Sequence, residues 1–377
     1  MRIALIRKKF AVQGGAERHV SDFIATLAKE GHEVHIFANE WEALEGVIFH
    51  RVPILSLGSF FKTLSFHLHL KKKMSGESFA IVQSNERTYP QDIYRAGDGC
   101  HREWLTQRGR YISSWKKALI KVSPFHVLML FMERKIFSEG NYKKIIAISE
   151  MGKREIMAHY GVPSDTIRVI YNGVDLEKFK PAAESEREKT RREWGVDADE
   201  KLLLFVGSGF ERKGLLFLLQ AVGRLKNEKI KLLVVGKGRQ GKYRALSRSL
   251  GIDAKVKFAG VIQEREKLFQ GADIFVFPSI YEPFGNVHLE ALAAGLPVIT
   301  TTKSGAAEII APHVNGVVVE EPSDIEEIAR TIRVLLDEET RKRMGREARK
   351  LAERFPLEKN ATEILDLYLE VLKMKNP

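Results

Sequence analysis

Residues 201–214 read KLLLFVGSGFERKG and bring together a strand, a loop and the start of a helix. The apolar run 202–206 has no polar interruption, which is typical of a strand buried on both faces of a parallel sheet. A glycine-rich loop follows, and an apolar helical pattern begins after Gly214. This order predicts one βα unit of a doubly wound α/β domain.

Similar units extend in both directions along the chain. The expected strands lie at residues 2–6, 34–38, 48–54, 79–83 and 144–148, and then at 201–206, 231–235, 256–258, 274–277, 298–301 and 317–319. A polar, charged stretch at 180–200 separates the two arrays and is expected to be a linker. We predict two Rossmann-like doubly wound domains facing across a cleft, residues 1–175 and 176–356, with the C-terminal helix 357–377 returning to the first.

The composition of the 377 residues is that of an ordinary globular protein, with 44% hydrophobic and 29% charged residues. The single Cys100 excludes an internal disulfide and favours a reducing compartment. The N-terminal sequence MRIALIRKKF lacks the apolar core of a secretory signal. The longest apolar stretch, 125–132, falls well short of the ~20 residues that span a bilayer. We therefore expect a cytoplasmic protein.

The net charge of +12 favours an anionic partner, which could be nucleic acid, an anionic membrane or a phosphorylated substrate. A nucleic-acid-binding protein would show base-stacking aromatic residues on a sheet face or a basic recognition helix. The sequence pattern shows neither feature, so we expect no nucleic-acid partner.

The first predicted strand leads to a loop with Gly14 and Gly15, and an amphipathic helix at 16–29 follows. Paired glycines let the backbone approach a ligand, and a helix N-terminus offers free N–H groups to an anion. A tight βα turn without a ligand explains the same residues. The dinucleotide pattern G-x-G-x-x-G is absent from this turn, which argues against a nicotinamide enzyme.

The loop at 207–214 has glycines, as the first loop does, and it also contains the basic pair Arg212 and Lys213. A guanidinium forks onto phosphate oxygens and an ammonium adds a point charge, so this pair suits a diphosphate. The spacing G-x-x-x-x-G-K-[ST] of a Walker A loop is missing. Two exposed basic residues at the entry to a helix are the alternative interpretation.

Two glutamates flank the start of a later predicted helix. Residues 282–290 read EPFGNVHLE and follow the predicted strand 274–277. Glu282 therefore belongs to a loop at the carboxyl end of a strand, where open α/β sheets bind ligands. A carboxylate at Glu290 could accept two hydroxyls of a ribose, and the N–H groups near 285–287 could hold a phosphate. Ordinary helix-surface glutamates are the alternative, which the apolar neighbours of Glu290 weaken.

These features together resemble the retaining glycosyltransferases of family 4, over essentially the whole chain. They are the two-domain layout, Gly14-Gly15, Arg212-Lys213, and Glu282 with Glu290. The resemblance implies the GT-B fold and a nucleotide-sugar donor without a further cofactor. It implies donor binding by Gly15, Gly209, Arg212, Lys213, Glu282, Phe284, Gly285, Asn286, Val287 and Glu290.

The resemblance also assigns chemical roles, with Glu282, Asp98, Arg212 and Lys213 as the expected catalytic residues. Glu282 would lie beside the transferred sugar and Glu290 would bind the ribose hydroxyls. The acceptor would attack from the face that the diphosphate leaves, through an oxocarbenium-like state that the two cations help to stabilise. Glu282 as a covalent nucleophile is the rival mechanism.

Residues 95–101, RAGDGCH, resemble the corresponding stretch of the lipopolysaccharide core glucosyltransferases. Those enzymes move glucose from UDP-glucose to an inner-core heptose. The resemblance implies that Asp98 and His101 lie near the acceptor or the transferred sugar, with a structural role as the alternative for His101. Nothing in the pattern separates glucose from other sugars. A family 4 enzyme with UDP-galactose or an N-acetylhexosamine donor, or with another glycolipid acceptor, is therefore the alternative function.

One string matches a metal motif, the Asp-x-Asp at Asp197 and Asp199. It falls in the polar stretch before a predicted strand, away from the proposed loops, so we interpret it as a chance match. Arg212 and Lys213 already supply the positive charge that a metal would bring. We predict no metal.

A basic, aromatic segment occupies residues 100–144, which carry ten basic and three acidic residues for a net charge of +7. Basic residues interleaved with aromatic ones are typical of an interfacial segment that binds anionic lipid. We expect Lys116, Lys117 and Lys121 to contact the cytoplasmic face of an inner membrane and to bring the protein to a lipid-linked anionic glycan acceptor. A packed helix pair with a solvated basic face is the alternative.

Overall fold

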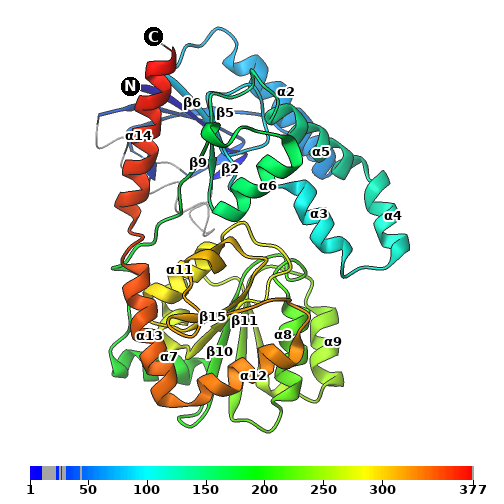
Figure 1. Ribbon diagram of the computed structural model, residues 1–377, viewed down its shortest axis with the longest axis vertical. Coiled ribbons are helices and arrows are strands. Elements are labelled where there is room, and N and C mark those ends of the chain that lie inside the picture. Colours follow the sequence, from blue (N-terminus) through cyan, green and yellow to red (C-terminus); the bar gives the residue numbers. More distant parts are fainter. Residues whose placement is uncertain (11–22, 25–26, 28–30, 43–44, 376–377) are drawn as a thin grey trace. The chain divides into compact units, whose positions relative to one another are not determined.

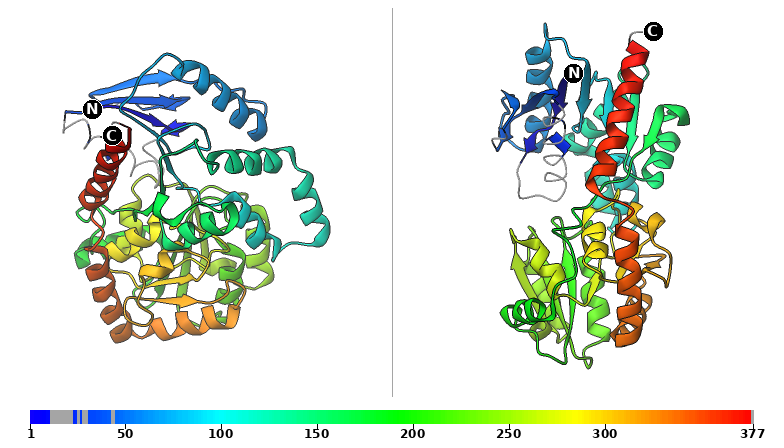
Figure 2. Two further views of the ribbon diagram at one scale, coloured as in Figure 1. Left: turned by 45° about the horizontal axis from the view of Figure 1, so that its top comes forward. Right: turned by 90° about the vertical axis from the view of Figure 1, so that its left-hand side faces the viewer.

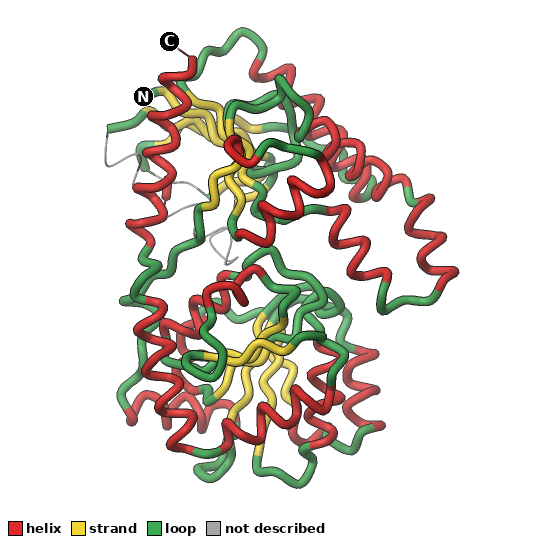
Figure 3. Tube along the Cα trace, viewed as in Figure 1, coloured by secondary structure: helices red, strands yellow, loops and turns green. Residues whose placement is uncertain are grey.

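The computed structural model describes residues 1–10, 23–24, 27, 31–42 and 45–375. It divides the chain into unit 1, Met1–Asn172 with Leu357–Pro377, and unit 2, Gly173–Pro356. The division falls after Asn172, whereas the sequence pattern predicts it after residue 175. In each unit the strands form one main sheet, and helices flank it (Figures 1 and 3).

Unit 1 is built on a parallel sheet with seven strands among the described residues. Its order is β5 (Val47–Arg51), β3 (Glu33–Ala38), β1 (Arg2–Ile6), β6 (Ile81–Ser84), β7 (Ile93–Arg95), β8 (Lys144–Ala147) and β9 (Ile167–Val169). A separate short pair joins β2 (Lys9–Phe10) to β4 (Glu40–Trp41). The main order is that of a doubly wound fold, whose direction reverses between β1 and β6.

Among the described residues of unit 1 the helices are α2 (Ser59–Met74), α3 (His101–Gly109), α4 (Ser114–Val122), α5 (Pro124–Ile136), α6 (Glu150–Tyr160) and α14 (Leu357–Lys375), with a 3-10 turn at Ser164–Thr166. The last helix, red in Figure 1, packs in the core of this unit through Ile364 and Tyr368. The Tyr368 hydroxyl donates to Gln83 Oε1 on β6 at 2.9 Å. Phe23, Ile24 and Leu27, the described members of the predicted helix 16–29, lie in the same core.

Two short helices of unit 1 project away from its sheet. Figures 1 and 2 show α3 and α4 extending outward from α5, and no residue of α4 is buried. The base of this projection is held by Glu133 on α5, which is 1% exposed. Its carboxylate accepts from the backbone N–H groups of His101 at 2.5 Å and Arg102 at 3.2 Å, the first residues of α3. The helix N-terminus and a buried carboxylate therefore stabilise each other.

Unit 2 repeats the same topology. Its parallel sheet has the order β12 (Val256–Gly260), β11 (Ile230–Val235), β10 (Lys201–Val206), β13 (Ile274–Val276), β14 (Val298–Thr301) and β15 (Gly316–Val319). The helices are α7 (Glu184–Trp194), α8 (Leu215–Arg224), α9 (Gly241–Ser249), α10 (Arg265–Gly271), α11 (Asn286–Ala293), α12 (Ile325–Leu336) and α13 (Glu338–Ala352), with 3-10 turns at Asp253–Lys255 and Gly305–Ile309. The direction of the strand order reverses between β10 and β13.

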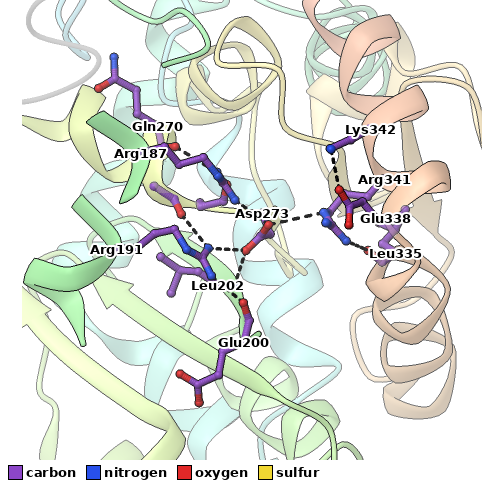
Figure 4. A network of polar contacts seen from close by, with 12 residues as sticks. Arg187, Arg191, Glu200, Leu202, Gln270, Asp273, Leu335, Glu338, Arg341 and Lys342 are labelled. Carbon is purple, nitrogen blue, oxygen red and sulfur yellow. Dashed lines mark hydrogen bonds and ion pairs between the residues drawn. The ribbon is translucent and has the colours of Figure 1, made fainter. Parts of the chain in front are cut away.

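The stretch expected to be a linker is instead a structural part of unit 2. It contains α7, on which Arg187 and Arg191 each place a guanidinium nitrogen 2.7 Å from a carboxylate oxygen of Asp273 (Figure 4). The linker prediction is wrong because the charges of this polar helix are buried against a carboxylate rather than solvated.

Asp273 joins several elements at the amino ends of the strands. Its carboxylate also lies 3.5 Å from Arg341 on α13 and accepts the N–H of Leu202 on β10 at 2.7 Å (Figure 4). A buried carboxylate shared by three guanidinium groups is well compensated, and removing one partner from such a cluster typically costs about 3–5 kcal/mol. The network stabilises the amino edge of the sheet, opposite to the edge where such folds bind ligands.

Candidate active site

The loops that follow β10 and β13 meet at the point where the strand order of unit 2 reverses. The Ile280 N–H donates to the Arg212 carbonyl at 2.9 Å, which joins the two loops directly. Gly214 lies in the left-handed region at φ 74°, and a Cβ there would come within 1.7 Å of the Pro278 carbonyl oxygen. The close approach therefore requires glycine, and it brings the two predicted motifs together.

The Glu282 carboxylate lies next to both cations of the β10 loop, Arg212 and Lys213. It forms an ion pair with Lys213, and its Oε2 lies 3.7 Å from Arg212 Nη2. Glu282 and Lys213 are buried, while about a third of the Arg212 side chain is exposed. The Lys213 ammonium also lies 5.1 Å from the centre of the Phe277 ring. The site thus places a carboxylate and two positive charges at one point of the carboxyl edge.

The backbone of Glu282 is fixed by the loop that follows β14. Its N–H donates to the Lys303 carbonyl at 2.9 Å, and its own carbonyl accepts from the Gly305 N–H at 2.8 Å. Three successive strands of the sheet therefore contribute loops to this region. These two backbone hydrogen bonds fix the position of the Glu282 main chain, from which its side chain extends.

His288, on the first turn of α11, holds the turn that carries Glu282. Its Nδ1 lies 2.9 Å from the Gly285 carbonyl oxygen, and its Nε2 lies 2.9 Å from Thr300 Oγ1. A carbonyl only accepts, so Nδ1 carries the proton and Nε2 can accept from the threonine hydroxyl. Burial lowers the pKa of His288 to about 4, which agrees with a neutral ring. Gly285 has φ 79°, and a Cβ there would lie 2.8 Å from His288 Nδ1.

Glu290 lies on α11 and is 5% exposed. Its Oε1 is 3.2 Å from an Nη of Arg265, the first residue of α10. Glu290 is predicted from the sequence, whereas Arg265 and His288 are not. Arg265 comes from a segment without a recognisable motif. His288 lies within the quoted stretch 282–290, but its contact with Thr300 on β14 depends on the packing of separate elements.

The remaining predicted donor residues lie around the same loops. Gly209 has φ 76°, and its carbonyl accepts the Arg212 N–H at 3.0 Å, so it starts the turn that presents the cations. Phe284, in the loop between β13 and α11, is fully buried. Asn286 and Val287 begin α11 and are half-buried. Gly15 lies outside the described residues, so its role stays a prediction.

Asp98 of unit 1 lines a cavity in that unit. This cavity of about 270 Å³ opens beside the ends of β1 and β6, where the strand order of unit 1 reverses. Lys8, Lys62 and Arg87 line it together with Asp98 and hydroxyl groups of α2. Arg87 Nη1 lies 3.5 Å from Asp98 Oδ2. Glu86 also lines the cavity, with its Oε2 3.4 Å from Lys8 Nζ. The cavity therefore combines three cations with two carboxylates and suits an anionic, hydroxyl-rich ligand.

Glu133 holds the Arg87 guanidinium, whose Nε donates to Glu133 Oε1 at 3.2 Å. Burial alone would lower the pKa of Arg87, but the charge of Glu133 outweighs it and raises the pKa above its usual range. His101 is buried next to this pair, with Nε2 2.9 Å from His126 Nδ1. Burial, Arg87 and His126 lower the pKa of His101 to about 3. His101 is absent from the lining of the Asp98 cavity, so its acceptor role stays a prediction.

Two family models match the chain, one for each half. Residues 13–178 match the model described as glycosyltransferase family 4, and residues 186–351 match the model described as glycosyl transferases group 1. The chain belongs to the family 4 glycosyltransferases. The two models together span both Rossmann-like units and the loops described above.

Relatives of this glycosyltransferase align along nearly its whole length. An uncharacterised glycosyltransferase of Methanocaldococcus jannaschii is 29% identical and covers 99% of both chains. The lipopolysaccharide glucosyltransferase WaaG of Escherichia coli K12 is 27% identical over 89% of this chain and 90% of its own. The crystal structure of WaaG matches with a TM-score of 0.83 at 25% identity, covering 97% of this chain and 99% of WaaG. The structure of Anabaena HepE with UDP-glucose matches with a TM-score of 0.77 at 18% identity, covering 98% and 100%. The glycosyltransferase thus has the GT-B fold.

The basic helix α4 of the glycosyltransferase presents an apolar face to solvent. Trp115 is 62% exposed, Leu119 57% and Val122 72%, at spacings that place them on one side of the helix. Lys116, Lys117 and Lys121 are exposed beside them. Helix α4 contacts α5, yet none of its residues is buried, and its binding to lipid stays a prediction. Among the described residues, no helix combines the length and the apolar character needed to cross a membrane.

The Asp-x-Asp string of the glycosyltransferase lies just before β10, at the amino edge of the sheet. Asp199 forms an ion pair with Lys229, and the Asp197 N–H donates to Glu200 at 2.9 Å. This edge lies at the opposite ends of the strands from the Arg212–Glu282 loops. Within the described ranges, no three His, Cys, Asp or Glu side chains cluster as metal ligands would. Independence from metal stays a prediction.

Proposed function

We propose that the glycosyltransferase moves a hexose, glucose, from UDP-glucose to a heptose of the lipopolysaccharide core, with retention of the anomeric configuration. The observation that carries this proposal is the meeting of Arg212, Lys213 and Glu282 at the reversal point of the unit 2 sheet. Similarity to WaaG over most of the chain supports the donor and the acceptor, and the UDP-glucose complex of HepE supports the nucleotide.

In this proposal the donor binds with its diphosphate at Arg212 and Lys213. The ammonium and guanidinium exchange part of their interaction with Glu282 for phosphate oxygens, which frees the Glu282 carboxylate to contact sugar hydroxyls. The first N–H groups of α11 add a partial positive charge for the same phosphates. Glu290, oriented by Arg265, accepts the ribose hydroxyls.

The reaction is a displacement of the nucleoside diphosphate by an acceptor hydroxyl. The bond between the anomeric carbon and the diphosphate oxygen breaks, and the leaving oxygens keep the electron pair beside Lys213 and Arg212. The acceptor oxygen forms the new bond on the same face, and its proton passes to the departing diphosphate. Fixed cations at the point where negative charge develops stabilise the transition state without reorganisation.

The acceptor occupies the Asp98 cavity of unit 1 in this proposal. Lys8, Lys62 and Arg87 attract its anionic groups, and Asp98 accepts a hydrogen bond from a sugar hydroxyl. The exposed apolar face of α4 and its three lysines dock the enzyme to the anionic cytoplasmic face of the inner membrane, where the lipid-linked acceptor lies.

The test is transfer of radiolabelled sugar to lipopolysaccharide that ends at the inner-core heptose. UDP-glucose, UDP-galactose and UDP-N-acetylglucosamine are supplied in parallel, without and with a chelator. We expect glucose to be transferred at least ~10-fold faster than the other sugars, as one well-placed contact allows. The product linkage, read by NMR, should have the α configuration of the donor. A preference for another sugar would correct the donor, an inverted product would correct the mechanism, and loss with chelator would overturn metal independence.

A further inference from the structure

A cavity of about 580 Å³ in unit 1 has no part in the proposed reaction. It lies between the carboxyl-terminal half of α2 (the blue helix of Figure 1) and the segment that joins β6 to β7. Lys143, which precedes β8, and Asp92, which precedes β7, line its rim. The cavity is therefore near the amino ends of these strands, away from the Asp98 cavity. Its volume is within the range of about 300–1,000 Å³ typical of small-molecule sites.

Two buried side chains in its lining have polar atoms without a hydrogen-bond partner among the described residues. Gln91 is 7% exposed, and neither its Nε2 nor its Oε1 is hydrogen-bonded among the described residues. His67 is 6% exposed, and its Nδ1 likewise has no partner within the described part of the chain. A buried polar group left unsatisfied costs about 1–3 kcal/mol, so such groups normally bind something. Burial and the nearby Lys71 lower the pKa of His67, which keeps the ring neutral.

The walls of the cavity indicate a flat ligand. Phe79, Tyr89 and Tyr142 contribute aromatic rings, and the Tyr89 ring lies 4.5 Å from that of His67. A carboxamide presents a donor and an acceptor side by side, and this pair matches the edge of adenine, where N7 accepts and the amino group donates. An acyl chain would leave the same groups unsatisfied.

The cavity is lined by three lysines and two acidic residues, of which Glu77 is paired with Arg2 at 2.9 Å. Lys71 and Lys143 line it and are exposed, and among the described residues neither has a carboxylate partner. Lys375 at the end of α14 is already paired with Asp92 at 3.0 Å. Two free ammonium groups beside an apolar, hydrogen-bonding cavity suit a phosphate at the mouth.

We propose that the cavity lined by His67, Gln91, Tyr89 and Tyr142 is a second ligand site, which binds an adenine mononucleotide with its base at Gln91 and its phosphate at Lys71 and Lys143. The site lies on unit 1 and does not depend on the proposed transfer reaction. Because α2 lines both this cavity and the Asp98 cavity, a bound nucleotide would stiffen a helix that the acceptor also contacts.

The experiment is calorimetric titration of AMP, adenosine, glucose 6-phosphate and inorganic phosphate into full-length Lys213→Ala protein, in which the proposed donor site is weakened. We expect saturable binding of AMP, weaker binding of adenosine, and no comparable binding of the other two. Gln91→Leu should raise the AMP dissociation constant at least ~10-fold, since a bidentate contact is lost. In a wild-type background the same change should leave UDP affinity unaltered.

Melting temperatures separate a ligand-binding role from a structural one. Gln91→Leu removes an unsatisfied buried amide, so the melting temperature should stay the same or rise, and AMP should no longer raise it. Lys143→Ser should weaken AMP binding but leave adenosine binding unaltered. Absence of saturable AMP binding, AMP binding unaffected by Gln91→Leu, or glucose 6-phosphate or phosphate binding as tightly as AMP would each overturn the proposal.

Discussion

Lys213 and Glu282 form an ion pair that is almost fully buried, although they belong to loops of different strands. Taking two charges out of water is costly, and their attraction seldom does more than offset that cost. A pair of this kind adds little to stability but places strong charges where water is largely excluded. In the proposed reaction those charges act on the diphosphate and on the sugar, where they have the greatest effect.

Substitution of Glu282 by Gln tests the contact with the transferred sugar. The change keeps the shape of the side chain but removes the charge, so we expect kcat/KM for UDP-glucose to fall by about 100-fold. UDP lacks the transferred hexose, and its affinity should change by less than about threefold. Steady-state kinetics and calorimetry give the two values. The matched control is Glu320→Gln, an exposed glutamate of the same unit, and an equal loss in both variants would contradict the assignment.

The neutral state of His288 makes the stability of unit 2 depend on pH. Its pKa is about 4 in the folded protein and about 6.5 ordinarily, so the unfolded chain binds a proton that the folded chain does not. The stabilisation is complete above pH 6.5 and is lost as the pH falls towards 4. When the pH falls from 7 to 5, the free energy of unfolding should decrease in both proteins. We expect the decrease to be about 2 kcal/mol smaller for His288→Gln than for the wild type.

Urea titrations at the two pH values provide this measurement. The exposed His313 offers a matched His→Gln control that should behave as the wild type does. If wild-type and His288→Gln proteins lost equal stability, the neutral, buried ring would not be the cause.

Some site residues could be predicted from the sequence and others could not. Arg212, Lys213 and Glu282 lie in loops that follow apolar strand patterns, and parallel strands all present their carboxyl ends at one edge. Arg265 and His288 act through side-chain contacts between separate elements, and no local pattern encodes such contacts. The cations that surround Asp98 escaped prediction for the same reason.

At the scale of elements, Gly214 sets how closely the β10 loop approaches the β13 loop. An alanine there would be strained at φ 74° and would clash with the Pro278 carbonyl. Gly195 at the end of α7 has a similar φ of 69° but no atom near its missing Cβ. Gly195→Ala should therefore cost about 1–2 kcal/mol, and Gly214→Ala at least ~2 kcal/mol more.

Denaturant unfolding measures both costs, and UDP titration measures the effect on the site. We expect Gly214→Ala to weaken UDP binding, while Gly195→Ala leaves it unchanged because it lies on a different part of unit 2. Equal stabilities of the two variants would show that the loops do not need this close approach.

Helix α4 is the element that we expect to bind membranes. Replacing Lys116, Lys117 and Lys121 by Ser removes three charges beside an exposed apolar face, each worth about 1 kcal/mol near an anionic surface. Binding to vesicles that contain anionic lipid should fall at least ~10-fold in sedimentation assays. Changing the exposed Lys71, Lys72 and Lys73 of α2 to Ser removes the same charge and serves as the control. An equal fall in both triple variants would point to general charge attraction alone.

Elements with strong apolar patterns could be predicted, and weak ones could not. The strands 2–6, 201–206 and 298–301 match β1, β10 and β14 at both ends. The short strands β7 (IYR) and β9 (IRV) are not predicted, because an arginine in each leaves no uninterrupted apolar run. Helix α7 was missed because its stabilising contacts are buried arginines, which a polar sequence does not reveal.

At the scale of the whole molecule, the basic residues behind the net charge of +12 have different roles in different parts of the chain. The segment 100–144 carries +7 of it, and much of this charge lies on the exposed α3–α4 projection. Other cations are held by carboxylates, as around Asp273, and add to stability rather than to binding (Figure 4). The composition alone indicated an anionic partner, whereas the fold shows which cations are available to meet one.

The most direct test of the central claim, that the Arg212–Glu282 loops form the donor site, is calorimetric titration of UDP into wild-type and Lys213→Ala proteins. We predict that UDP binds the wild type at one site per chain. Lys213→Ala should bind at least ~10-fold more weakly, because a charge-assisted contact to phosphate is lost. The exposed Lys226→Ala should bind as the wild type does. No UDP binding by the wild type, or equal affinity in the Lys213→Ala protein, would contradict the claim.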